Sequence, residues 1–261
     1  MPKQWFEKQP PRIDTTDLDG VFIVVEGPDA VGRTEQIKLL KWWLEQQGYA
    51  VSSQVGLSRS ALAGPELLEA KKGNALRPRT MALFYATDFY DQLENSIMPA
   101  LRAGQVVLAD RYVYSLMARA IVRGVEPDWI ASIYSRAMVP DAVYCLLATP
   151  QKQIERTLAR HGHLDFWESG MDLGLAPDMF DSFIRYQKKL KDQLVKLQAK
   201  YKFELVNANR SVNTIHRDLR ARVQRVLEQH TPPKQDPVDR PEAHGNGEKP
   251  IPAIAKKETT P

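Results

Sequence analysis

Residues 27–34 have the residue types and the spacing of a loop that binds phosphate. They follow the apolar run 21–25 and precede a helical pattern that begins near Thr34. Backbone N–H groups of such a loop point inward, and the dipole of the following helix adds partial positive charge at the same place. The pattern is G-x-x-x-x-G-K-[ST], a P-loop, except that Arg33 stands at the lysine position. It predicts a site for nucleoside phosphates, and a glycine turn before a helix is the alternative.

We call residues 27–34 the phosphate loop, and several of its residues have distinct expected roles. Gly27 and Gly32 permit the tight path that brings the backbone close to phosphate. Arg33 keeps a positive charge and would reach the outer phosphates, although a guanidinium is longer than an ammonium and planar. Thr34 stands where a hydroxyl helps to hold Mg²⁺. The phosphate loop comprises Gly27, Pro28, Asp29, Ala30, Val31, Gly32, Arg33 and Thr34.

An Asp-Arg pair, Asp110 and Arg111, follows the short apolar run 105–109. An aspartate at the end of a buried strand beside the phosphate loop can accept hydrogen bonds from water bound to Mg²⁺. The neighbouring arginine can hold a phosphoryl group during its transfer. An exposed ion pair at a strand end is the alternative interpretation. Together with the phosphate loop about 80 residues earlier, the pair favours phosphoryl-transfer chemistry.

Two further arginines, Arg156 and Arg160, are four residues apart and therefore share one face of a predicted helix. A glycine-bearing segment, residues 161–174, follows them. A mobile flap that carries arginines suits phosphoryl transfer, because it excludes water and neutralises charge. A solvated basic face is the alternative. His161 and His163 lie in this segment without convincing ligand partners, so we assign no metal to them.

Alternating apolar runs and helical patterns predict the fold that positions these residues. The predicted strands are residues 21–26, 49–55, 105–109, 142–147 and 203–206. The predicted helices are residues 34–47, 65–72, 80–103, 151–160, 178–200 and 212–227, with two shorter ones beginning at Val113 and Asp128. Short continuous apolar strands indicate a parallel sheet with helices on both faces. The prediction is a doubly wound α/β fold with five parallel strands and an arginine-bearing lid, and ligands at the carboxyl ends of the strands.

Composition sets the limits of the chain's organisation. The 261 residues are 43% hydrophobic with a formal net charge of +4, and no basic stripe points to nucleic acid. No apolar run approaches the length of a membrane span, and a single cysteine, Cys145, indicates a reducing compartment, so we expect a cytoplasmic protein. One domain is predicted over residues 20–228, between a flexible leader (1–19) and a disordered tail rich in proline and charge (229–261).

Taken together, the motifs resemble the thymidylate kinase family. The resemblance is carried by the phosphate loop with Glu26 before it, by Leu-Phe-Tyr-Ala-Thr-Asp at 83–88, by Asp-Arg-Tyr-Val-Tyr-Ser at 110–115, by the segment 156–168, and by residues 206–216. These motifs cover nearly all of residues 20–228 in order. The resemblance implies transfer of the γ-phosphoryl group of ATP to thymidine monophosphate with Mg²⁺, and it implies a homodimer.

The resemblance also implies roles for single residues. The phosphate loop would hold the ATP phosphates, and Asp29 would face the sugar hydroxyl or the phosphate of the acceptor. Arg59 matches an arginine that meets the acceptor phosphate, Tyr85 a ring that stacks on the base, and Ser115 a residue near the base edge. Asp110 and Arg111 would order Mg²⁺ and phosphates, and Arg156 and Arg160 would supply charge at the transition state.

This chain departs from the family's pattern at several positions, among them Ser60 and Ala61, where bacterial members often have Glu-Pro. Arg33 replaces the lysine of the phosphate loop, and Phe89 stands where the family usually has an arginine for the acceptor. Leu116 and Arg119 stand where polar or aromatic residues often touch the nucleoside, and Arg119 is a candidate to replace the charge missing at Phe89. Two alternatives follow from these departures: a kinase for a different nucleoside monophosphate, and a nucleotide-binding regulatory protein without catalytic activity.

Overall fold

The computed structural model describes residues 3–6, 17–57, 59–60, 64–72 and 76–230, and within them five strands form a parallel sheet. The strands are β1 (Val21–Glu26), β2 (Val51–Gly56), β3 (Val106–Asp110), β4 (Ala142–Leu147) and β5 (Glu204–Asn207). Their order in space is β2-β3-β1-β4-β5, so β1 lies at the centre of the sheet. β1 and β3 are buried along their whole length, which explains why their sequences are nearly continuous apolar runs.

The register of the central strands brings the predicted site residues to one edge of the sheet. In β3, Asp110 lies opposite Val25 of β1, and on the other side of β1, Cys145 of β4 lies opposite Glu26. All these strands are parallel, so their carboxyl ends lie at the same edge. The phosphate loop leaves β1 after Glu26 and therefore begins beside the Asp-Arg pair at the end of β3.

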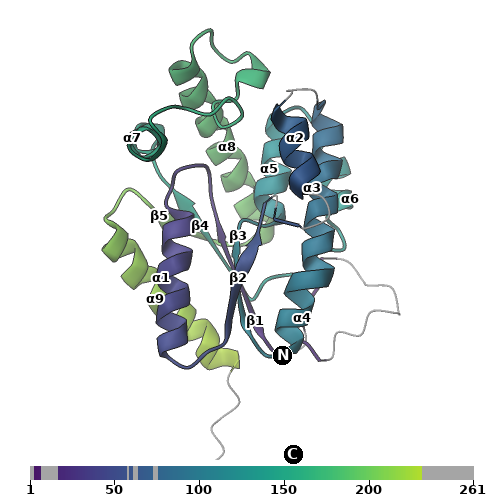
Figure 1. Ribbon diagram of the computed structural model, residues 1–261, viewed down its shortest axis with the longest axis vertical. Helices are drawn as coiled ribbons and strands as arrows, with labels where there is room; N and C mark the ends of the chain where they lie inside the picture. The colour runs from purple at the N-terminus through teal and green to yellow at the C-terminus, as the bar shows by residue number, and fades with distance from the viewer. Residues whose placement is uncertain (1–2, 7–16, 58, 61–63, 73–75, 231–261) are drawn as a thin grey trace, which may run out of the picture. The chain divides into compact units, whose positions relative to one another are not determined.

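Helices cover both faces of the sheet, as predicted (Figure 1). On one face α1 (Arg33–Gln46) packs against α9 (Val212–His230). On the other face lie α3 (Pro78–Gln92), α4 (Met98–Arg102), α5 (Val113–Val122) and α8 (Met179–Tyr201). The remaining α-helices of the described residues are α2 (Gly64–Lys72), α6 (Pro127–Ile133) and α7 (Pro150–His161). The arrangement confirms the doubly wound α/β fold.

Most element bounds agree with the predicted ones to within two residues, and the main difference lies inside the predicted helix 80–103. A π-helical turn, Leu93–Ile97, separates α3 from α4. There the backbone N–H of Met98 donates to the carbonyl of Leu93, five residues earlier. The next residue, Pro99, has no N–H to continue the usual ladder, and the wider turn makes room for its ring. Hydrophobic periodicity does not register such a turn.

The ends of the described chain pack on the domain. Trp5 forms an isolated antiparallel bridge with Met138, and Lys3 pairs with Asp141. The rest of the predicted leader is described only at residues 17–19, and the predicted tail lies outside the described residues from 231 onward. α9 continues to His230, two residues beyond the predicted domain boundary.

Among the described residues, no helix combines the length and the apolar character that crossing a bilayer requires.

Candidate active site

A cavity of about 780 Å³ opens where the phosphate loop meets α5, α7 and the segment after α7. Its volume lies within the range of about 300–1,000 Å³ that is usual for small-molecule sites. Leu57, Lys71 and Trp167 are among the other residues that line the cavity. Of the predicted site residues, the cavity is lined by Asp29, Ala30, Val31, Gly32, Arg33, Thr34, Tyr85, Arg111, Arg119, Arg156 and Arg160.

The two glycines of the phosphate loop are required for different reasons. Gly27 has a φ of +139°, and a Cβ there would lie 2.3 Å from the carbonyl oxygen of Leu146 in β4. Gly32 has a φ of +97° with open space around it, so backbone conformation alone favours glycine there. Gly32 directly precedes α1, and the loop therefore ends at the helix N-terminus as the motif predicts.

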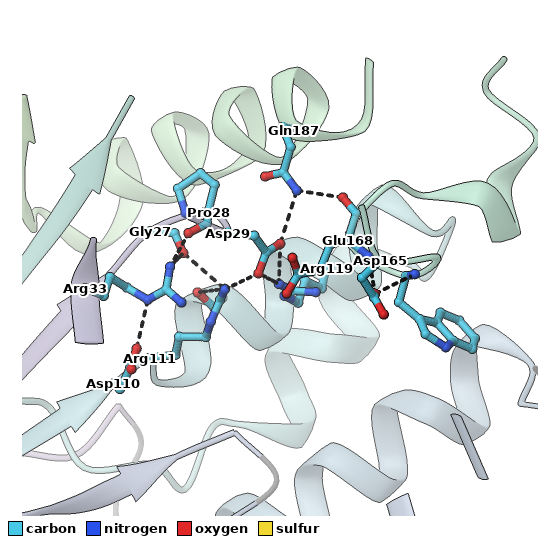
Figure 2. A network of polar contacts seen from close by, with 12 residues as sticks. Gly27, Pro28, Asp29, Arg33, Asp110, Arg111, Arg119, Asp165, Glu168 and Gln187 are labelled. Carbon is cyan, nitrogen blue, oxygen red and sulfur yellow. Dashed lines mark hydrogen bonds and ion pairs between the residues drawn. The ribbon is translucent and has the colours of Figure 1, made fainter. Parts of the chain in front are cut away.

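The Arg33 side chain turns back onto the phosphate loop and hydrogen-bonds to it. Its Nε donates to Oδ1 of Asp110 at 2.9 Å, and its Nη1 donates to the carbonyl oxygens of Gly27 (2.8 Å) and Pro28. Figure 2 shows this guanidinium between the loop and the end of β3. The side chain is only 10% exposed, yet the residue also lines the cavity. Arg33 therefore braces the loop and presents positive charge to the cavity.

Asp110 does not itself line the cavity, but it contacts Arg33 and Thr34, which do. Its second carboxylate oxygen accepts a hydrogen bond of 2.7 Å from the hydroxyl of Thr34, and Nη2 of Arg59 lies 3.9 Å from the same oxygen. Burial alone would raise the pKa of Asp110, but the charges of Arg33 and Arg111 outweigh it and lower that pKa. The carboxylate is therefore ionised and adjoins a hydroxyl at the mouth of the phosphate loop.

Arg111 has an unusual backbone conformation, with a φ of +79°. Its N–H donates to the carbonyl of Val25 at 3.0 Å, while its guanidinium reaches the Gly27 carbonyl (3.0 Å) and Asp29 (2.5 Å). Non-glycine residues with positive φ are strained and cluster at functional sites. Burial and the charge of Arg33 lower the pKa of Arg111 to about 10. The side chain remains cationic at neutral pH.

Asp29 is the centre of a buried network on the cavity floor. Arg119 donates to both of its carboxylate oxygens, at 2.6 and 2.7 Å, and Gln187 donates to one of them at 3.1 Å (Figure 2). Although burial opposes it, the charges of Arg119 and Arg111 lower the pKa of Asp29 below its usual value. Gln153 of α7 donates to the backbone carbonyl of Asp29 at 2.6 Å. The network ties the phosphate loop to α5, α7 and α8.

Sequence reasoning missed Glu26 and misplaced the hydroxyl of Ser115. Ser115 is 1% exposed, does not line the cavity, and directs its hydroxyl to the carboxylate of Glu26. Glu26 is fully buried and also accepts from the backbone N–H groups of Tyr112 and Ser115, at 2.8 and 3.1 Å. Burial raises the pKa of Glu26. The sequence did carry a signal for Glu26, because it is an acidic residue at the end of an otherwise apolar predicted strand.

Trp167 and Glu168, in the segment that follows α7, also line the cavity. Neither of them was predicted from the sequence as a site residue. The indole N–H of Trp167 donates to the carbonyl of Lys71 at 3.0 Å, which joins this segment to α2. Arg123, at the C-terminal end of α5, anchors the same segment, because it donates to the carbonyl of Trp167 and pairs with Asp172 at 2.8 Å. The charge of Asp29, with burial, raises the pKa of Glu168 to about 7.

The two predicted lid arginines differ in their surroundings. Arg156 donates to the carbonyls of Val31 (3.1 Å) and Ala208 (2.9 Å), so it links the phosphate loop to the segment after β5. Arg160 is exposed, lines the cavity, and makes no hydrogen bond or ion pair with the described residues. The role of this segment as a lid that closes stays a prediction.

On the predicted acceptor side, Tyr85 lines the cavity, while Phe89 is 5% exposed and packs among aromatic rings. Its ring centroid lies 5.2 Å from that of Tyr112 and 5.4 Å from that of Tyr134. Phe89 therefore presents no polar group here. Arg119, one turn after Leu116 on α5, lines the cavity and supplies a cation on this side.

Comparisons with known proteins agree with this geometry. Residues 25–219 match the family model described as thymidylate kinase. The chain is 34% identical over 205 residues to a probable thymidylate kinase 2 of Saccharolobus solfataricus, covering 78% of this chain and 95% of that protein. It is 32% identical over 219 residues to a probable thymidylate kinase of Pyrococcus abyssi, covering 80% and 98%. The family is indicated by the phosphate loop at the end of β1 and by the Asp-Arg pair at the end of β3. The match to these relatives extends over most of the domain. The chain belongs to the thymidylate kinase family.

Proposed function

We propose that the protein catalyses ATP-dependent phosphorylation of thymidine monophosphate, dTMP + ATP → dTDP + ADP. The observation that carries the proposal is the convergence of the phosphate loop with arginines from α5 and α7 on one cavity of about 780 Å³. Two nucleotides carry several negative charges, and a cavity lined by guanidinium groups and loop amides matches them. ATP is the phosphoryl donor of the family to which the chain belongs.

The donor phosphates would lie against the phosphate loop, whose backbone N–H groups and following helix favour anions. The hydroxyl of Thr34 and the carboxylate of Asp110, 2.7 Å apart, are oxygen ligands of the kind that Mg²⁺ prefers. No cluster of three acidic, histidine or cysteine side chains suited to a metal occurs among the described residues, so phosphate oxygens and water would complete the coordination. Held by Thr34 and Asp110, Mg²⁺ would neutralise negative charge on the phosphates.

In the proposed reaction, a phosphate oxygen of dTMP forms a bond to the γ-phosphorus of ATP. The bond from that phosphorus to the β–γ bridging oxygen breaks, and ADP leaves with the electron pair. Arg33 and Arg111 stabilise the negative charge from the loop side, and Arg156 and Arg160 do so from α7. No side chain needs to form a covalent intermediate, because positioning and charge neutralisation supply the catalysis.

The acceptor would lie on the side of Tyr85 and Arg119. The Tyr85 ring lines the cavity and offers a face for the base. Arg59, whose side chain is 39% exposed at the exit of β2, would meet the acceptor phosphate beside Asp110. Asp29, held between Arg111 and Arg119, would face the sugar hydroxyl or the phosphate.

A coupled ADP-release assay tests the proposal. Purified protein receives ATP, Mg²⁺ and each nucleoside monophosphate in turn, beside a double variant, Arg33→Ala with Thr34→Ala. We expect turnover with dTMP well above that of the variant. Turnover only with a different monophosphate would identify another acceptor. ATP binding by calorimetry without turnover on any acceptor would instead favour a regulatory nucleotide-binding protein.

We further propose a cytoplasmic homodimer without a nucleic-acid partner. The dimer rests on the family resemblance, and the compartment rests on the single cysteine, Cys145, which is buried in β4. Sedimentation equilibrium of the full chain tests the dimer, and a monomer mass at every concentration would contradict it.

A further inference from the structure

A small side pocket opens off the acceptor end of the main cavity. Lys71, Tyr85, Arg119 and Trp167 line both spaces, so the two are neighbours. The side pocket has a volume of about 20 Å³, and apolar side chains such as Leu116 supply most of its remaining wall. That volume is close to the minimum of about 10–15 Å³ that one water molecule needs. The side pocket therefore has room for about one non-hydrogen atom of a ligand whose bulk lies in the main cavity.

Two polar atoms of residues that line the side pocket are buried without a hydrogen-bond partner among the described residues. They are the hydroxyl oxygen of Tyr134 and Nε of Arg119. Tyr134 as a whole is only 2% exposed. Buried polar atoms are nearly always paired, and an exception indicates a water, an ion or a ligand that supplies the missing partner. Both residues line the side pocket, so each brings an unpaired polar atom to its surroundings.

Tyr134 contributes a hydroxyl to this end of the acceptor site, where several neighbouring side chains are apolar. Phe89, where the family pattern has an arginine, packs its ring edge-on against Tyr134 at 5.4 Å. Leu116, another position that often touches the nucleoside, lines the side pocket with an apolar side chain. Burial raises the pKa of Tyr134 well above its usual value, so its hydroxyl stays protonated and can donate.

We propose that Tyr134 is a specificity-determining residue of the acceptor site, whose hydroxyl donates a hydrogen bond to an exocyclic oxygen of the acceptor's base. The base itself would lie against Tyr85 in the main cavity, and only the oxygen would enter the side pocket. Nε of Arg119, which also lines the side pocket, is a second buried donor without a partner among the described residues. This assignment rests on the proposed kinase function and gives the hydroxyl a use that no other described contact supplies.

The test compares Tyr134→Phe with the wild-type chain. Removing one hydrogen bond should raise KM for dTMP about 3- to 10-fold, with kcat within about twofold and KM for ATP unchanged. 2-Deoxyribose 5-phosphate, which has no base, serves as a competing ligand of the same site. Its inhibition constant should be equal in the two proteins. The unliganded variant should melt no lower than wild type, because the lost hydroxyl had no protein partner.

Tyr144→Phe is the matched control. Its hydroxyl is also buried without a partner, but it lies in the core on the other face of the sheet and lines none of these spaces. KM for dTMP should not change in this variant. An unchanged KM in Tyr134→Phe, in an enzyme that phosphorylates dTMP, would overturn the assignment and leave the kinase function intact. A wild-type chain that neither binds nor phosphorylates any monophosphate would overturn both.

Discussion

Arg33 and Arg111 donate to the same atom, the carbonyl oxygen of Gly27, at 2.8 and 3.0 Å. Two guanidinium groups approach each other at the start of the phosphate loop, and each pairs with a different carboxylate. Arg33 pairs with Asp110 at 2.9 Å, and Arg111 pairs with Asp29 at 2.5 Å. The arrangement fixes the loop through its carbonyl side.

Arg33→Ala should lower both activity and stability. The variant loses contacts to two loop carbonyls and leaves Asp110 without its closest cation. We expect kcat to fall about 100-fold, as on loss of one transition-state donor, and the free energy of unfolding to fall by about 2 kcal/mol. Steady-state kinetics and urea denaturation measure the two effects. Lys41→Ala, on the exposed face of α1, is the control.

Arg33→Lys separates charge from geometry at the same position. A lysine keeps the positive charge but lacks the planar fork that reaches a carboxylate and two carbonyls together. We expect kcat between those of wild type and Arg33→Ala, with most of the stability loss retained. A lysine variant as inactive as the alanine variant would show that the three-point contact, rather than the charge, carries the function.

Asp29→Asn should destabilise the domain strongly. The substitution removes the charge that pairs with Arg111 and Arg119, both of which are largely buried. Breaking such a buried pair costs about 3–5 kcal/mol, because an uncompensated charge remains in the interior. Urea denaturation measures the loss, and Asp181→Asn, on the exposed side of α8, gives the baseline. Equal stability of the two variants would contradict the central role of Asp29.

The two arginines of α7 should give different phenotypes. Arg160→Ala removes an exposed guanidinium that has no hydrogen bond or ion pair with the described residues, so kcat should fall about tenfold or more while the melting temperature stays the same. Arg156→Ala also breaks hydrogen bonds to Val31 and Ala208, so the melting temperature should fall by a few degrees, or about 1 kcal/mol. Scanning calorimetry and kinetics on both variants make the comparison. Identical losses of stability would contradict the assigned contacts.

Glu168 should make stability depend on pH. The charge of Asp29, with burial, raises the pKa of Glu168 to about 7 from a usual value of 4.5. Between these values the folded chain keeps a proton that the unfolded chain has released. The contribution of Glu168 to stability is therefore fully present below about pH 4.5 and is lost as pH rises through about 7. Arg119 and Arg111 oppose the shift.

Urea denaturation of wild type and Glu168→Gln from pH 5 to pH 8 checks this dependence. The stability of wild type relative to the variant should fall across that range. Glu155→Gln, an exposed position on α7, controls for loss of a surface carboxylate. A constant difference between wild type and Glu168→Gln would contradict the raised pKa.

Much of the fold could be predicted because its signals are local. Residues 21–26 and 142–147 are short apolar runs, and both form strands with the predicted bounds. The alternation of such runs with helical patterns also predicted a parallel sheet, since the crossover connections between parallel strands are usually helices. The π-helical turn Leu93–Ile97 escaped prediction because it depends on how the backbone accommodates Pro99, not on periodicity.

Sequence alone determined that the phosphate loop leaves β1 and that Asp110 and Arg111 leave β3, because motif spacing and strand ends are properties of short segments. Only the tertiary structure decided which partners the charged groups take. Arg33 and Asp110 are 77 residues apart, and Arg119 and Asp29 are 90 apart. Such pairs form where packing brings segments together and burial makes an unpaired charge costly. The inward turn of Arg33, the burial of Ser115 and the unpaired hydroxyl of Tyr134 all follow from that packing.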